Sequence, residues 1–183
     1  MKPFMFSGFL LLLLAACASK PASEPSLYRP TATIKDIMDS MVDPNADFVW
    51  NSVATIVDAE GEHERFPQTD EEWKELRRHT VTLLEATNLL LIPGRHIARP
   101  GEKAENPNVE LSPEEIEALV NKDRASWIRL AHGLHDSVAL ALKAVDARDK
   151  EGIMTAGGGI QDACESCHQK YWYPNDTTGL KRY

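Results

Sequence analysis

The sequence predicts an all-α protein built as an antiparallel four-helix bundle. Apolar residues recur at helical spacing in four separate segments, and no segment shows the alternation that is typical of a strand. Two of these segments begin with residues that favour the start of a helix. With 183 residues, of which 43% are hydrophobic, the chain is long enough to bury the core of one domain.

The first predicted helix begins near Thr33 and continues to Val57. Asp43 and Pro44 have the character of an internal N-cap and a first-turn proline, so we expect the helix to restart there with a kink. Its apolar stripe comprises Ile34, Ile37, Met38, Met41, Phe48, Val49, Val53, Ile56 and Val57.

The second predicted helix begins at Thr69, has three acidic residues in its first turn and ends at Pro93-Gly94. One face carries Trp73, Leu76, Thr80, Leu83, Leu84, Thr87 and Leu91. A long connection without clear periodicity follows, over residues 93–111. The third helix begins at Ser112-Pro113. Its inward face carries Ile116, Leu119, Val120, Trp127, Leu130, Leu134, Val138, Ala141, Leu142 and Val145.

The fourth predicted helix runs from about Lys150 to Trp172. It includes three consecutive glycines, Gly157-Gly158-Gly159, and each of them weakens a helix by about 1 kcal/mol relative to alanine. These glycines either permit close approach of another group or mark a break in the helix. The sequence does not choose between the two.

The fourth helix also carries the run Cys164-Glu165-Ser166-Cys167-His168. A c-type haem is held by thioethers from two cysteines, and the histidine that follows supplies a nitrogen to iron. A helix places these three side chains on one face. No second CxxC or Cys/His pair completes a zinc site, and no strand pattern precedes the run as in a thioredoxin-like dithiol. The motif predicts one covalent haem c, and an unmodified dithiol or disulfide is the remaining alternative.

The N-terminal segment has the pattern of an export signal. An apolar stretch too short to span a bilayer ends in Leu14-Ala15-Ala16-Cys17, which resembles the lipobox of bacterial lipoproteins. We therefore expect a signal peptide over residues 1–16, a lipidated Cys17 with a flexible tether over 17–30, and one domain over 31–183. This places the domain on the periplasmic side of the cell envelope, anchored to a membrane by lipid. Ala18 in place of aspartate favours the outer membrane.

The chain is acidic, with 28 Asp and Glu against 20 Lys and Arg and a formal charge of −8. A nucleic-acid partner is therefore not expected. A protein partner that docks by charge is expected to present a basic surface.

An exported helical chain with CxxCH on its last helix and methionines on its first resembles the class II cytochromes c, which are cytochrome c′ and its low-spin relatives. The resemblance covers about residues 31–173 and is strongest at Cys164, Cys167, His168 and Tyr171. It implies a monohaem electron carrier, with His168 as the proximal iron ligand, and a homodimer formed through the first two helices. Many members have Arg or Lys after the tyrosine, whereas this chain has Trp172, so that basic residue cannot be carried over.

The resemblance leaves the sixth iron position to be decided. Met38 and Met41 are spaced i, i+3 on the first helix, and a methionine there would give low-spin, electron-transferring iron. Met38 is the preferred ligand because it lies deeper in the unbroken first segment, and Met41 is the alternative. If both methionines only fill space in the hydrophobic core, the iron is five-coordinate and binds nitric oxide or carbon monoxide. A haem-free lipoprotein that acts as an adaptor is the third reading.

Other polar residues give weaker indications. Arg95 and Arg99 lie in the long connection and could pair with haem propionates, although a solvated loop is the preferred interpretation. His132 and His135 are expected at the surface or its boundary. No nucleophile with a base and no paired carboxylates stand at a defined spacing, so we do not expect an enzyme.

Overall fold

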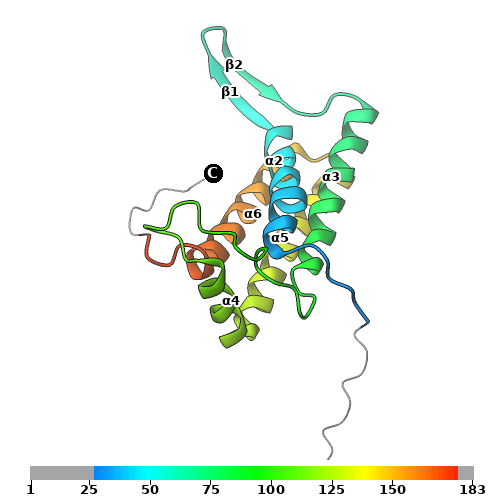
Figure 1. Cartoon of the computed structure of the whole chain (residues 1–183). Helices are drawn as coiled ribbons and strands as arrows, with labels where there is room; N and C mark the ends of the chain where they lie inside the picture. The colour runs from blue at the N-terminus through cyan, green and yellow to red at the C-terminus, as the bar shows by residue number, and fades with distance from the viewer. Residues whose placement is uncertain (1–26, 177–183) are drawn as a thin grey trace, which may run out of the picture.

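The computed structural model describes residues 27–176, which form a mostly helical protein with one two-stranded sheet (Figure 1). The elements in chain order are α1 (Ile34–Ile37), η1 (Met38–Val42), α2 (Asp43–Ser52), β1 (Ala54–Asp58), β2 (Gly61–Arg65), α3 (Asp70–Leu89), α4 (Pro113–Lys122), α5 (Arg124–Ala147) and α6 (Lys150–Tyr171). The predicted signal peptide, Cys17 and the tether as far as residue 26 lie outside the described residues.

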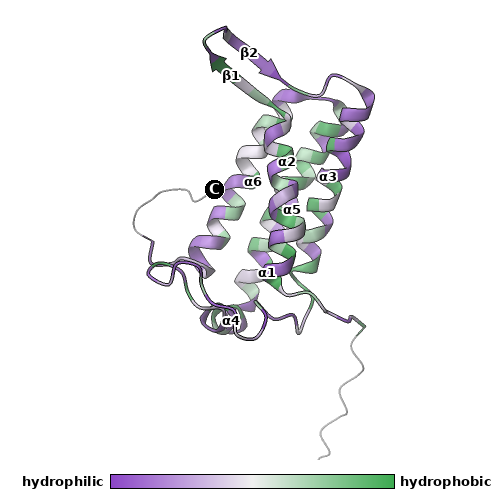
Figure 2. Cartoon of the chain, turned by 45° about the horizontal axis from the view of Figure 1, so that its top comes forward, coloured by the Kyte–Doolittle hydropathy of each residue, from purple (hydrophilic) through white to green (hydrophobic). Residues whose placement is uncertain are grey.

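The long helices pack lengthwise around one core. Helix α5 contacts α6 and α3 most extensively, and α2 contacts α3 and α6. Figure 2 shows hydrophobic residues along these helices, interspersed with hydrophilic residues. The largest fully buried side chains include Leu76, Leu83, Val138, Ile153 and Ile160. Each buried aliphatic side chain contributes about 1.5–3 kcal/mol from the area removed from water. None of the helices within residues 27–176 combines the length and apolar character needed to cross a membrane.

The first helix differs from the prediction at Asp43. The predicted N-cap there was wrong, because Asp43 has helical dihedral angles (φ −58°, ψ −56°) and no side chain caps the start of α2. The chain passes instead through the π-helical segment η1, where the amide of Asp43 donates to the carbonyl of Met38 five residues earlier. Pro44 has no N–H for the carbonyl of Ser40, so the regular α-helical bonding cannot continue. The irregularity expected near Pro44 is therefore a π-helical turn.

The predicted continuation of this helix through Val57 was wrong. Helix α2 ends at Ser52, and β1 pairs antiparallel with β2, with Ala54 opposite Arg65. The residues after Ser52 are mostly β-branched, which favours extended backbone, and Gly61 supplies the positive φ of 121° that the turn requires. The hairpin projects beyond the end of α2 (Figure 1), and its Val57 side chain is 75% exposed.

Helix α3 begins as predicted, with the Thr69 side chain accepting from the amide of Glu72 in a capping box. It ends at Leu89, four residues before the predicted end at Pro93. The last turn tightens, because the amides of Leu90 and Leu91 donate to carbonyls three residues earlier. The indole of Trp127 then donates to the carbonyl of Leu90 over 3.0 Å, which ties the end of α3 to α5.

The third predicted helix is divided in two at Asp123. This residue leaves the helical region (φ −134°, ψ 61°), ends α4 and caps α5 by accepting from the amide of Ser126. Its carboxylate also accepts from Nζ of Lys170 over 2.8 Å, and its carbonyl accepts from the hydroxyl of Tyr171 over 3.3 Å. Asp123 therefore accepts three hydrogen bonds at the break, and two of them come from residues at the end of α6.

Candidate functional site

The CxxCH run lies in the last third of α6, as predicted. Cys164, Cys167 and His168 are half-buried, whereas Ser166 and Gln169 on the other side of the helix are exposed. Both cysteines pack against the hydrophobic core cluster. One face of α6 therefore presents two sulfur atoms and an imidazole toward the protein interior.

The two cysteines are free thiols, and burial raises the pKa of both above the ordinary thiol value. Burial raises the pKa of Cys164 to about 12, with a smaller contribution from the Asp43 carboxylate. Burial also raises the pKa of Cys167 to about 12, with a contribution from Cys164. A reactive redox dithiol requires a lowered thiol pKa, usually at a helix N-terminus or beside a cation. The environment of these cysteines has the opposite effect.

His168 is held as a neutral imidazole. Burial lowers its pKa to about 4, and the Glu165 carboxylate opposes that shift only in part. The ring of Trp172 contacts it edge-on, with ring centroids 5.0 Å apart and planes at 88°, and Tyr173 lies 6.0 Å away. A neutral imidazole nitrogen is the form that binds a metal ion.

The end of α6 is fixed to other parts of the protein. Tyr171 is 3% exposed and contacts Trp127 edge-on at 5.3 Å, which packs the end of α6 onto the start of α5. The hydroxyl of Tyr173 donates to Glu165 over 3.0 Å, and the amide of Leu111 donates to the carbonyl of Trp172 over 2.8 Å. These contacts hold the backbone that carries His168.

The methionine-bearing segment packs against the same core. Met38 and Met41 in η1 are half-buried and contact the cluster that Cys164 and Cys167 also contact. Asp43, at the junction of η1 and α2, acts electrostatically on the Cys164 thiol. The structure thus brings the η1–α2 junction and the CxxCH run to one region of the core.

Helix α6 is continuous over its three glycines, and Gly157 allows close approach of another helix. The indole of Trp50 on α2 donates to the carbonyl of Gly157 over 3.0 Å. A groove of about 270 Å³ lies between the two helices at this level. It is lined by Val49, Trp50, Val53, Ile153, Met154, Gly157, Gly158 and Gln161.

A pair of alanine substitutions tests this close approach. A Cβ at Gly157 would lie 3.2 Å from Cδ1 of Trp50, whereas a Cβ at Gly158 would meet nothing within 4 Å. We expect Gly158→Ala to stabilise the protein by about 0.5–1 kcal/mol and Gly157→Ala to destabilise it by about 1 kcal/mol or more. Urea unfolding at an unchanged m-value measures both. Equal stabilisation by the two variants would contradict the tight contact with Trp50.

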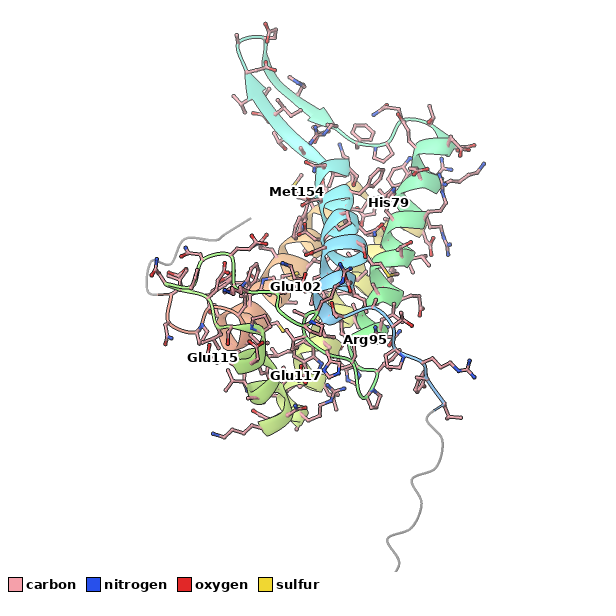
Figure 3. The ribbon with its side chains drawn as sticks, in the orientation of Figure 1. His79, Arg95, Glu102, Glu115, Glu117 and Met154 are labelled. Atoms are coloured by element: carbon pink, nitrogen blue, oxygen red, sulfur yellow. The ribbon has the colours of Figure 1, made fainter. Side chains whose placement is uncertain are left out.

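The arginines of the long connection bind protein groups. Nε of Arg95 donates to the carbonyl of Leu89 over 3.0 Å, and its guanidinium also bonds to the carbonyl of Ala32 (Figure 3). Arg99 pairs with Asp36 near the start of α1. Both residues tie the connection to neighbouring segments, and their pairing with haem propionates stays a prediction.

Two histidines on α5, His132 and His135, were candidates for a surface or boundary role. His132 is exposed on α5, as expected, and His135 is half-buried beside Asp136. Within the described part of the chain, no three His, Cys, Asp or Glu side chains converge to hold a metal ion by themselves. A haem iron would not need such a group, because the porphyrin itself supplies four nitrogen ligands.

Comparisons of this chain with models of protein families, with curated proteins and with solved structures find no match. The residues of the site are therefore the basis on which we propose a function.

Sequence reasoning found the CxxCH run but missed several residues around it. Asp43, Trp50 and His79 make contacts with other helices that no local pattern marks. Pro44 was the one available signal, since a proline inside a helix leaves a carbonyl that needs another donor.

Proposed function

We propose that the protein is a monohaem c-type cytochrome that carries electrons in the bacterial cell envelope. The proposal includes an antiparallel four-helix bundle with haem c on its last helix, formed by α1–α2, α3, α5 and α6. One observation carries it: two protonated thiols and a neutral imidazole lie on one inward face of α6, in the CxxCH spacing.

The donor set of this face fits haem c. Addition of each thiol across one vinyl group would exchange an S–H bond and a C=C π bond for a C–S bond and a C–H bond, so attachment would need no oxidant. Cys164 and Cys167 would make these thioethers, and His168 would provide its neutral nitrogen to iron. Trp172 and Tyr173 pack beside the imidazole and limit the access of water to it. These residues favour permanent attachment with a fixed proximal ligand.

Met38 and Met41 would supply the sixth ligand, with Met38 preferred. Both belong to η1 and pack against the same core cluster as the two cysteines. Haem iron supplies a one-electron couple, and a thioether ligand stabilises its ferrous state and raises the potential. In this proposal η1 would hold a methionine sulfur in place, so that no coordination position of the iron stays open to a gas ligand.

An acidic strip beside the site supports docking of a basic redox partner. Asp39, Asp43 and Asp47 are exposed and follow one another at helical spacing along η1 and α2. Partial burial, then the nearby charges of Asp47 and Asp39, raise the pKa of Asp43, because like charges disfavour its ionised form. A cationic surface would relieve this repulsion. We propose that such a partner approaches the edge of the protein nearest to Cys164, while a lipid on Cys17 holds the protein at the membrane.

The decisive experiment expresses the full chain in a bacterium with cytochrome c maturation proteins. We expect one covalent haem per chain in a pyridine haemochrome assay, and a low-spin spectrum of the reduced protein that carbon monoxide changes slowly or not at all. The matched control omits the maturation proteins. A high-spin protein that binds carbon monoxide at once would favour the five-coordinate alternative, and a chain without haem would favour the adaptor.

A further inference from the structure

His79 makes a set of contacts between α3 and α2 that the proposed function does not yet use. It lies on α3 beside α2 (Figure 3), and its ring stacks on Phe48 with centroids 3.7 Å apart and planes at 12°. Its Nε2 lies 3.1 Å from Oε1 of Glu75 one turn earlier on α3. Stacking on Phe48 therefore fixes the plane of the ring.

The other edge of the ring faces Asn45, which is only 7% exposed. Nδ2 of Asn45 donates to the carbonyl of Met41 over 2.6 Å, so Oδ1 is the end of the amide that faces His79. That oxygen accepts from Nδ1 of His79 over 2.7 Å. A chain of two hydrogen bonds thus runs from a side chain of α3 to the backbone of η1.

This chain reaches the backbone where the helix is least regular. Pro44 removes one backbone donor, and the π-helical bond from Asp43 to Met38 spans five residues. Side-chain hydrogen bonds therefore have more influence on the position of η1 than they would in an unbroken α-helix. Partners of this kind, beyond the ligands themselves, commonly set the orientation of a metal ligand.

We infer that His79 is a positioning residue that acts through Asn45 to fix η1, and with it the methionine side chains offered to the iron. This inference rests on the proposed function, because it assigns a role at the same site. It does not require contact between His79 and the haem. It identifies α3 as the helix that sets the sixth position.

Two substitutions at His79 separate the hydrogen bond from the bulk of the ring. His79→Asn keeps a nitrogen donor at the δ position, whereas His79→Leu keeps volume and removes the donor. We expect amide exchange of Val42, Asp43, Asn45 and Ala46 in the purified full chain to become about three- to tenfold faster in His79→Leu and to stay near the wild-type rate in His79→Asn. His132→Leu, at an exposed histidine of α5, is the matched control.

Amide exchange tests the inference whether or not the chain carries haem. Unchanged exchange in His79→Leu would overturn it, as would equal acceleration in His79→Leu and His79→Asn. In the haem-loaded protein we also expect His79→Leu to weaken the sulfur-to-iron charge-transfer band and to increase the fraction that binds carbon monoxide. Faster exchange without these changes would overturn the link to the ligand. A chain that carries no haem would refute the proposed function, and the exchange rates would still decide whether His79 fixes η1.

Discussion

Replacing Cys164 and Cys167 together by alanine is expected to abolish covalent haem attachment. Because the thioethers are the only covalent links in the proposed site, no haem should remain with the polypeptide after denaturation and extraction into acidified organic solvent. Haem staining of the denatured protein and the pyridine haemochrome assay measure this loss. Each single variant should retain one thioether and show a shifted haemochrome band.

The control for this result is Ser166→Ala. Ser166 lies between the two cysteines on the exposed side of α6, where its hydroxyl donates to the carbonyl of Asp162 over 2.7 Å. We expect this variant to carry as much haem as the wild type. Retention of covalent haem by the double cysteine variant, or an equal loss in Ser166→Ala, would contradict the assignment. Circular dichroism of each variant reports whether the helices persist without haem.

Replacing Met38 by alanine is expected to convert the low-spin iron to a high-spin form that binds carbon monoxide readily. Loss of the thioether removes the ligand that favours ferrous iron, so the reduction potential should fall by on the order of 100 mV. The near-infrared sulfur-to-iron band of the oxidised protein should disappear. Spectroscopic redox titration measures the change in potential, and mixing with carbon monoxide measures the open position.

Substitutions of two other methionines show whether the effect is specific to Met38. Met154→Ala is the matched control, because Met154 is 51% exposed on α6 beside the groove and should leave the spectrum unchanged. Met41→Ala tests the alternative ligand. If Met41→Ala has the large effect and Met38→Ala does not, the preference between the two is reversed. If neither variant alters the spectrum, methionine ligation is refuted.

Capping and spacing made much of the helical structure predictable. Thr69 caps α3 through Glu72, and Ser112 caps α4 through Glu115, as their sequence positions indicated. These bonds join residues three positions apart, so the pattern that forms them is visible in the chain itself. The same locality explains why the face of α6 that carries Cys164 and His168 could be predicted.

Three features depended on distant partners and were missed. Asp123 looks like an ordinary helical residue, but its bonds to Lys170 and Tyr171 favour a break between α4 and α5. The helix predicted through Val57 gave way to a hairpin, in which each strand requires the other for its hydrogen bonds. The role of His79 depends on Asn45, 34 residues earlier.

The sequence by itself determined the chemistry that the site can offer, since two thiols and an imidazole in CxxCH spacing share a helix face wherever that helix lies. Only the tertiary structure decided how far the pKa values of these groups are shifted. Burial raises the pKa of both thiols and lowers the pKa of the imidazole, and burial depends on packing of α6 against distant segments. The inferred role of His79 extends this to η1, because Pro44 removes a local backbone donor and the contact with α3 comes from a distant part of the sequence.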